Sequence, residues 1–276
     1  MPLSRLASDP AWCVYALGDR APHLAPHCEW HVESSGPPAV LLLFRAFEIP
    51  VLFTHGEPAA VAPLLDEIVH EPALYLSIRP AILPLIRARW RVASEAPMWR
   101  MTLAPEDFAP ATLQPSLAPV RLGLEHLPHL ETLFADGAAT GEAPDFFAPY
   151  MVEQGAFYGL FEGSGLIAAA GTHLIAPAQG VAAVGNVYTR RDRRGRGLAA
   201  LVTSAVAAEL LAHQPPLGVI ALNVNQSNLA AQRVYRRLGF RTYCDFYEGL
   251  AASPVSPSPP SRGDHGPRNA VERGKG

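Results

Sequence analysis

The segment from 187 to 200 is the part of the sequence that most constrains the fold. It leaves an apolar strand, crosses a loop with five arginines in seven positions, and enters an alanine-rich helix. Gly195 and Gly197 permit positive φ angles and a close approach of another group to the backbone. The first turn of a helix also presents N–H groups that have no intrahelical partner. The segment therefore predicts a strand–loop–helix unit that can hold a phosphate.

Simpler interpretations of this segment fit less well. An arginine run is often only a solvated surface, but the two glycines argue against that interpretation. Gly195 to Ala200 also match the dinucleotide pattern G-x-G-x-x-A, yet five residues separate Thr189 from Gly195, and the next strand ends without a carboxylate. A P-loop sequence is absent. Because a helix terminus alone contributes ~0.3–2 kcal/mol to anion binding, the arginines would have to assist.

The sequence around this segment has a mixed α/β pattern. Leucines spaced three apart predict a helix over 124–135, and strands 156–162 and 165–175 predict a hairpin. Two strand–loop–helix units and a last strand follow, at 184–189, 198–212, 218–224, 229–238 and 240–247. The N-terminal part repeats this order more weakly, with strands at 40–47, 51–55, 74–78 and 99–102 and helices at 59–69 and 82–90. We interpret it as a degenerate internal duplicate.

Proline-rich stretches set the expected domain limits. Prolines recur every few residues over 104–118, which indicates a linker between an N-terminal domain at 1–103 and a C-terminal domain at 119–250. Residues 251–276 are dominated by Pro, Ser and Gly, so we expect a disordered tail there.

The C-terminal motifs carry a family resemblance. Arg194 to Ala199 match R-x-x-G-x-A, and Asn225, Asn228, Tyr235 and the pair Gly239-Phe240 follow one strand and one helix later. Together they resemble the acyl-CoA signature of the GNAT superfamily of N-acetyltransferases, and the sequence 185–189 is similar to the glycine N-acyltransferase-like branch. The resemblance implies an α/β fold: a GNAT-type mixed, mostly antiparallel sheet flanked by helices, with a smaller α/β N-terminal domain.

The resemblance also implies a set of residues that bind acetyl-CoA as the acyl donor. Main-chain groups of Val187, Tyr188 and Thr189 would hold the pantetheine arm, in a gap where their strand separates from the next one. The amides of the loop and first helical turn would bind the pyrophosphate, namely those of Gly195, Arg196, Gly197, Leu198, Ala199 and Ala200. Arg194 is the motif arginine, and Arg190, Arg191 or Arg196 would reach the remaining phosphate.

Three further residues take roles by resemblance or by local pattern. Asn225 and Asn228 would hydrogen-bond the CoA arm, and Asn228 is also placed to cap a helix. Tyr235 would donate a proton to the departing thiolate, although by composition a tyrosine beside apolar residues is more often packed in the core. The sequence does not identify the general base, for which His173 and Glu153 are candidates.

The expected function is acetyl transfer from acetyl-CoA to a primary amine, carried by a small molecule or a peptide, by direct attack. The alternative is a non-catalytic acyl-CoA-binding or regulatory module. The N-terminal counterpart of the phosphate loop places Gly56, Glu57 and a proline where the C-terminal copy has its motif, so we expect it to bind no phosphate. Asp145, Phe146, Phe147 and Tyr150 could line the acceptor pocket, although such clusters are more often core.

Composition limits the partners. A net charge of −3 with 49% hydrophobic and 17% charged residues is typical of an ordinary globular protein and disfavours nucleic acid as a partner. We expect no membrane span, no signal segment and a cytoplasmic protein, because the apolar runs fall short of the ~18–20 residues that cross a bilayer. The three widely spaced cysteines indicate neither disulfides nor a metal site. Whether the protein forms a homodimer is a question that the sequence does not decide.

Overall fold

The computed structural model describes residues 3–33, 36–112, 117–138, 140–144 and 146–254. The chain forms two compact units, and neither is continuous in the sequence. Unit 1 comprises Met1–Arg100, Asn225–Ser227 and the chain from Tyr243 onward, whereas unit 2 comprises Met101–Val224 and Asn228–Thr242. The tail expected at 251–276 lies mostly outside the described residues, as does Asp145. Within the described ranges, no helix is long and apolar enough to cross a membrane.

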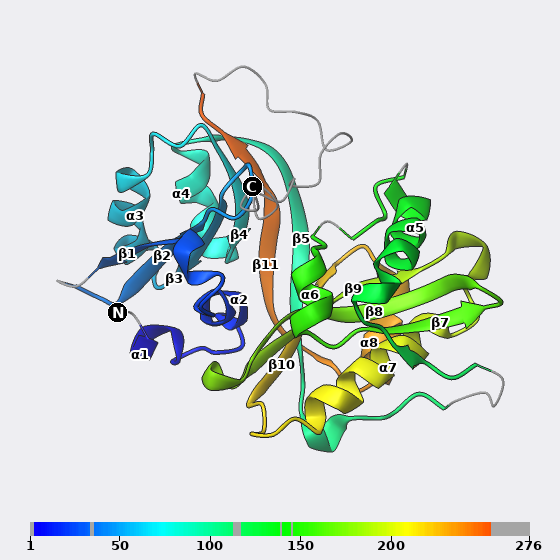
Figure 1. Ribbon diagram of the computed structural model, residues 1–276. Coiled ribbons are helices and arrows are strands. Elements are labelled where there is room, and N and C mark those ends of the chain that lie inside the picture. Colours follow the sequence, from blue (N-terminus) through cyan, green and yellow to red (C-terminus); the bar gives the residue numbers. More distant parts are fainter. Residues whose placement is uncertain (1–2, 34–35, 113–116, 139, 145, 255–276) are drawn as a thin grey trace, which may run out of the picture. The chain divides into compact units, whose positions relative to one another are not determined.

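Unit 2 contains antiparallel strands followed by a parallel strand–helix–strand (Figure 1). Its elements are η3 (Pro105–Asp107), β6 (Val120–Arg121), η4 (Leu124–His126), α5 (Leu127–Ala138), α6 (Pro149–Gln154), β7 (Tyr158–Glu162), β8 (Gly165–Ala176), η5 (Pro177–Gln179), β9 (Val181–Thr189), η6 (Arg191–Arg193), α7 (Leu198–Leu211), β10 (Val219–Asn225) and α8 (Leu229–Arg237). Strands β6 to β9 pair antiparallel in that order, and β9 pairs parallel with β10.

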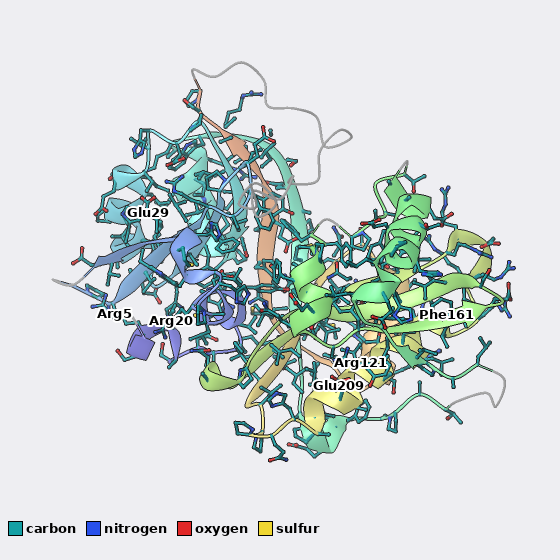
Figure 2. The ribbon with its side chains drawn as sticks, in the orientation of Figure 1. Arg5, Arg20, Glu29, Arg121, Phe161 and Glu209 are labelled. Atoms are coloured by element: carbon teal, nitrogen blue, oxygen red, sulfur yellow. The ribbon has the colours of Figure 1, made fainter. Side chains whose placement is uncertain are left out.

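Helix α7 is the central helix of unit 2. Apolar residues occupy all of its faces, which is typical of a helix that is buried rather than amphipathic. It packs on β7, β8 and β9. At its far end, Glu209 accepts a hydrogen bond from Nε of Arg121 on β6 at 2.8 Å (Figure 2). Packing along its length and this hydrogen bond at its end therefore anchor α7 on the sheet.

Unit 1 repeats the same order of elements. It contains α1 (Leu3–Leu6), α2 (Val14–Gly18), η1 (Ala25–His27), β1 (Cys28–Glu33), β2 (Ala39–Phe44), β3 (Val51–His55), α3 (Pro58–Glu67), β4 (Ala73–Ile78), η2 (Pro80–Ile82), α4 (Leu83–Arg87) and most of β5 (Arg91–Leu103) and β11 (Arg241–Ala252). Strands β1, β2 and β3 are antiparallel, and β3 is parallel to β4.

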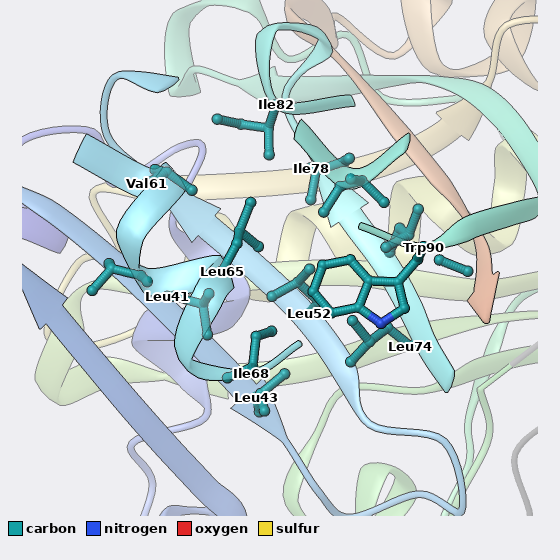
Figure 3. Close-up of a cluster of buried hydrophobic side chains, with 14 of the residues drawn as sticks. Leu41, Leu43, Leu52, Val61, Leu65, Ile68, Leu74, Ile78, Ile82 and Trp90 are labelled. Atoms are coloured by element: carbon teal, nitrogen blue, oxygen red, sulfur yellow. The ribbon is translucent and has the colours of Figure 1, made fainter. Parts of the chain in front are cut away.

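The core of unit 1 lies between these strands and the helices α3 and α4. Every residue of β2 is buried, and leucines of β2, β3 and β4 pack against Val61, Leu65 and Ile68 (Figure 3). Trp90 closes the cluster, and its indole N–H donates to the carbonyl of Glu71 at 3.1 Å. The two units thus share the order of a hairpin, a helix and a parallel strand, and the interpretation of the N-terminal part as a degenerate duplicate stays a prediction.

Several strands are longer than the sequence predicts, and β9 begins at Val181 rather than at 184. Strand β5 covers thirteen residues rather than 99–102, because its first half alternates exposed and half-buried residues and lacks an apolar run. Strand β11 runs to Ala252, and its residues Tyr247–Ala252 pair with β4 in unit 1. The sequence analysis instead placed the C-terminal domain limit at 250, since a strand's own residues do not encode which strand it joins.

Candidate functional site

The parallel strands β9 and β10 separate part-way along their length. Their last hydrogen-bonded pair joins Val184 to Leu222, while β9 continues to Thr189 and β10 to Asn225. From Gly185 onward, the edge of β9 that faced β10 therefore lacks its parallel neighbour. This is the separation that the family resemblance implies, and it leaves main-chain groups of Val187, Tyr188 and Thr189 along the gap.

Two β-bulges lie beside the point of separation. Between the pairs Ala169–Tyr188 and Gly171–Gly185, β9 has one more residue than β8. Between the pairs Thr172–Val184 and Leu174–Ala183, the extra residue is His173 on β8. Bulges bend a strand and redirect side chains, and they are frequent near functional sites. The β9 bulge contains Asn186, whose φ of 52° makes it the one non-glycine residue with a positive φ in the described part of the chain.

The loop between β9 and α7 has the shape of an anion cradle. Gly195 and Gly197 both have φ of 77°, and Gly197 is the N-terminal cap of α7. A Cβ at either glycine would meet no other heavy atom within 4 Å, so the space above the loop is open. The first N–H groups of α7, from Leu198 to Ala200, have no partner within the helix. Unpaired amides beside open space are what a phosphate group requires of a backbone.

The arginines of the loop make ion pairs with acidic residues. Arg194 donates to the carbonyl of Thr189 at 3.2 Å and to Glu142 at 3.0 Å, and its guanidinium lies over the ring of Tyr188. Arg190 binds Asp192 at 2.7 Å. In addition, Arg193 binds Glu162. These hydrogen bonds lower the pKa of Glu142, Asp192 and Glu162 below their usual values.

The three arginines expected to reach the remaining phosphate differ in how firmly acidic residues hold them. Arg190 is held by both oxygens of Asp192. Arg191 and Arg196 make only longer ion pairs, of 3.9 Å to Asp136 and 3.6 Å to Glu162. The side chains of Arg191 and Arg196 would therefore break weaker ion pairs than Arg190 in order to turn toward a ligand. The motif arginine, Arg194, braces the loop against the end of β9.

Tyr188 contributes its main chain to the gap and its side chain to the core. The side chain is buried, and its hydroxyl donates to Asp136 at 2.9 Å. Asp136 also accepts the backbone N–H of Arg191 at 3.0 Å. These two hydrogen bonds, the backbone one first, lower the pKa of Asp136. Asp136, Glu142 and Glu162 were missed by the sequence analysis, because acids from separate elements carry no spacing signal.

The two asparagines after β10 form local hydrogen bonds. The side-chain oxygen of Asn228 accepts the N–H of Ala231 at 3.0 Å, so Asn228 caps α8 as expected. The oxygen of Asn225 accepts the N–H and the hydroxyl of Ser227, at 2.8 and 2.7 Å. Both side chains thus shape the turn, and their hydrogen bonds to a CoA arm stay a prediction.

Tyr235 lies on the inner side of α8. It is buried, and its ring packs edge-on against Phe240 at 6.1 Å between centroids. Burial raises the pKa of Tyr235 to about 12. The hydroxyl is therefore protonated at neutral pH, which is the state that a proton donor needs.

The two candidate bases differ in their surroundings. His173 packs against β9, where a Cβ at Gly185 would collide with its imidazole. Burial lowers the pKa of His173 to about 4, so the ring is neutral at neutral pH. Glu153 is exposed at the end of α6. Of the proposed acceptor-pocket aromatics, Phe147 and Tyr150 pack against the buried cluster around Phe134, which favours a core role.

A family model described as an FR47-like protein matches residues 157–248. This stretch contains the bulged strand, the cradle and Tyr235. The C-terminal part of the chain is a GNAT-superfamily domain. A search of curated proteins finds no match. Among the described residues, no group of His, Cys, Asp or Glu side chains is arranged to hold a metal ion.

Solved GNAT structures resemble nearly the whole chain. A GNAT-family protein from Novosphingobium aromaticivorans is 25% identical, with a TM-score of 0.58 over 92% of this chain and 100% of that one. A GCN5-related N-acetyltransferase from Kribbella flavida is 18% identical, with a TM-score of 0.61 over 88% and 95% of the two chains. A tandem GNAT protein from the clavulanic acid biosynthesis pathway is 16% identical, with a TM-score of 0.54 over 85% of each. The last of these is described as a tandem GNAT protein, and its likeness to this chain is one of fold.

Proposed function

We propose that this GNAT-family acetyltransferase transfers the acetyl group of acetyl-CoA to a primary amine, with the site in unit 2. The observation that carries the proposal is the combination of the β9–β10 separation and the open cradle at Gly195 and Gly197. An extended arm with amide groups fits a strand edge that has lost its partner, and a pyrophosphate fits unpaired amides at a helix start. Both features lie on the same strand–loop–helix.

The residues of the chain would divide the chemistry as follows. The amides of the loop and of the first turn of α7, from Gly195 to Ala200, bind the pyrophosphate, and the β9 main chain from Val187 to Thr189 orients the thioester carbonyl toward the amine. The amine nitrogen forms the amide bond as the carbon–sulfur bond breaks. Tyr235 gives its proton to the thiolate, and the proton lost by the amine passes through solvent or a base and restores Tyr235.

One observation favours the alternative, a non-catalytic acyl-CoA-binding module. Neither candidate base is well suited to the task, because His173 has a strongly lowered pKa and Glu153 is exposed. A water chain to solvent would have to replace them in the enzyme. Release of CoA in the presence of amines separates the two functions, since a binding module would give none.

Cofactor binding can be tested with one substitution at the cradle. Gly197→Glu places a carboxylate in the open space where the pyrophosphate would lie, so calorimetric titration should show that acetyl-CoA binding is lost. Gly180→Glu is the matched control, because Gly180 has φ of 67° and a Cβ there meets only Gly218 at 3.7 Å. It adds the same charge and a similar strain at the β8–β9 turn. Equal loss in both variants, or binding retained by Gly197→Glu, would contradict the assignment of the cradle.

A further inference from the structure

The side chain of Asn186 is the strongest unexplained feature of the site. Only 4% of the residue is exposed, and its side-chain oxygen is buried without a hydrogen-bond partner. Its amide nitrogen has a single weak acceptor, the sulfur of Met151 at 3.6 Å. Buried polar atoms are nearly always satisfied, so an unpaired carboxamide oxygen requires an explanation.

The backbone at Asn186 is also strained. A positive φ of 52° disfavours any residue with a Cβ, and asparagine tolerates it better than most. Glycine would adopt this conformation without cost, as it does at Gly195 and Gly197. A residue that combines strain with an unpaired oxygen is expected where function outweighs stability.

The position of Asn186 relates it to the reacting centre. It lies two residues beyond Val184, the last residue of β9 that pairs with β10, and inside the β9 bulge. Its contact with Met151 shows that the side chain points out of the sheet toward α6. Main-chain groups of β9 can hydrogen-bond a ligand that lies in the plane of the sheet, whereas a side chain of β9 reaches a ligand that lies on one face of the sheet.

We propose that the side-chain oxygen of Asn186 accepts a hydrogen bond from the attacking amine and positions it beside the thioester, on the face of the sheet covered by α6. This inference rests on the proposed function. The oxygen can only accept, so its ligand must donate an N–H, as a primary amine does. The contact supplies orientation without a charge that would hold the amine as an ammonium ion, which cannot attack.

The test uses two variants that the backbone tolerates. Asn186→Gly removes the oxygen and fits the positive φ, and Asn186→Asp keeps an acceptor oxygen at a residue type that also tolerates this conformation. The wild type is first screened for CoA-thiol release with a panel of proteinogenic amino acids and short alkylamines, and the best amine serves as the probe. Acetyl-CoA affinity is measured in parallel by calorimetry, and thermal stability by calorimetric melting.

We expect the substitution to weaken the use of the amine without weakening the binding of acetyl-CoA. In Asn186→Gly, KM for the amine should rise ~10-fold or more, the loss expected for a hydrogen bond to a reacting group, with acetyl-CoA affinity and Tm unchanged or Tm raised. Asn186→Asp should restore most of the amine KM but lower kcat, because its carboxylate would hold the bound amine as an ammonium ion. An unchanged amine KM in Asn186→Gly would overturn the inference, and so would weaker acetyl-CoA binding or a large fall in Tm. If the wild type itself binds no acetyl-CoA, the proposed function fails instead.

Discussion

Both units contain a parallel strand pair whose pairing ends before the strands do, but the loops that follow the first strand differ in the space around their glycines. In unit 2 the last pair is Val184 with Leu222, and in unit 1 it is Phe53 with Ser77. In each unit a helix follows the first strand of the pair. The two units therefore share this backbone framework, in unit 2 the one that we propose binds the cofactor, and they differ in the residues around it.

The chain itself fills the framework of unit 1. Thr54 is the first residue beyond the last pair, and its carbonyl accepts the indole N–H of Trp12 at 2.9 Å. Trp12 is 1% exposed and packs against Phe53 at 5.1 Å between ring centroids. At the loop, a Cβ on Gly56 would lie 2.8 Å from the carbonyl oxygen of Pro38, where Gly195 and Gly197 have open space.

Charge reinforces the difference. The residue before α3 is Glu57, whose carboxylate would repel a phosphate at the helix start. In unit 2 the same position is Gly197, which follows five arginines. The comparison teaches that two units with the same strand order can differ in the space and charge at their strand ends, which is where the proposed ligand would bind.

The largest effect should come from Tyr235→Phe. Loss of the hydroxyl removes the proposed proton donor, so kcat should fall by roughly 10²- to 10⁴-fold while acetyl-CoA affinity is retained. Steady-state CoA release and calorimetry measure the two quantities. A kcat within a few-fold of the wild type would show that unit 2 does not use this residue as its acid.

Trp12→Ala should mainly affect stability. Removal of a buried tryptophan costs about 3–5 kcal/mol of unfolding free energy, here from unit 1. Urea denaturation followed by tryptophan fluorescence measures it, with Val69→Ala, at a half-exposed residue, as the control. Folded Trp12→Ala protein should bind acetyl-CoA as tightly as the wild type, and weaker binding would contradict the restriction of the site to unit 2.

Alanine at one loop glycine of each unit compares the two loops directly. Gly56→Ala forces a Cβ to within 2.9 Å of Ala39, whereas Gly195→Ala meets no atom within 4 Å. Both variants carry the cost of a positive φ, which is greater at Gly56 (φ 128°) than at Gly195 (φ 77°). Overpacking adds to this difference, so Gly56→Ala should lose at least about 1–3 kcal/mol more stability. Equal losses of unfolding free energy in urea would show that the unit 1 loop can relax and is not closed.

The smallest effect should be a pH dependence at Asp136. Its pKa is lowered in the folded state by the N–H of Arg191 and the hydroxyl of Tyr188, so it stabilises the fold above its unfolded-state pKa. This stabilisation disappears as the pH falls through the folded-state pKa. Asp136→Asn should therefore show a smaller drop in Tm than the wild type between neutral pH and about pH 3. Identical pH profiles would refute the contribution of Asp136 to the loop.

The sequence predicted the parts of the site that depend on local pattern. The cradle glycines, the start of α7 and the cap at Asn228 all follow from residues a few positions apart. The features that it missed depend on contacts between distant segments: the acids that pair with the arginine loop, the strand that β11 joins, and Trp12 against Thr54. The positive φ of Asn186 was also missed, because a bulge is defined by the register between two strands.

The most direct test of the account is the stoichiometry of acetyl-CoA binding to the wild-type chain, measured by isothermal titration calorimetry. The account predicts one molecule per chain, with binding abolished by Gly197→Glu and unaffected by Gly180→Glu. Two molecules per chain, or one molecule that still binds to Gly197→Glu, would contradict the proposal that unit 2 alone binds the acyl donor.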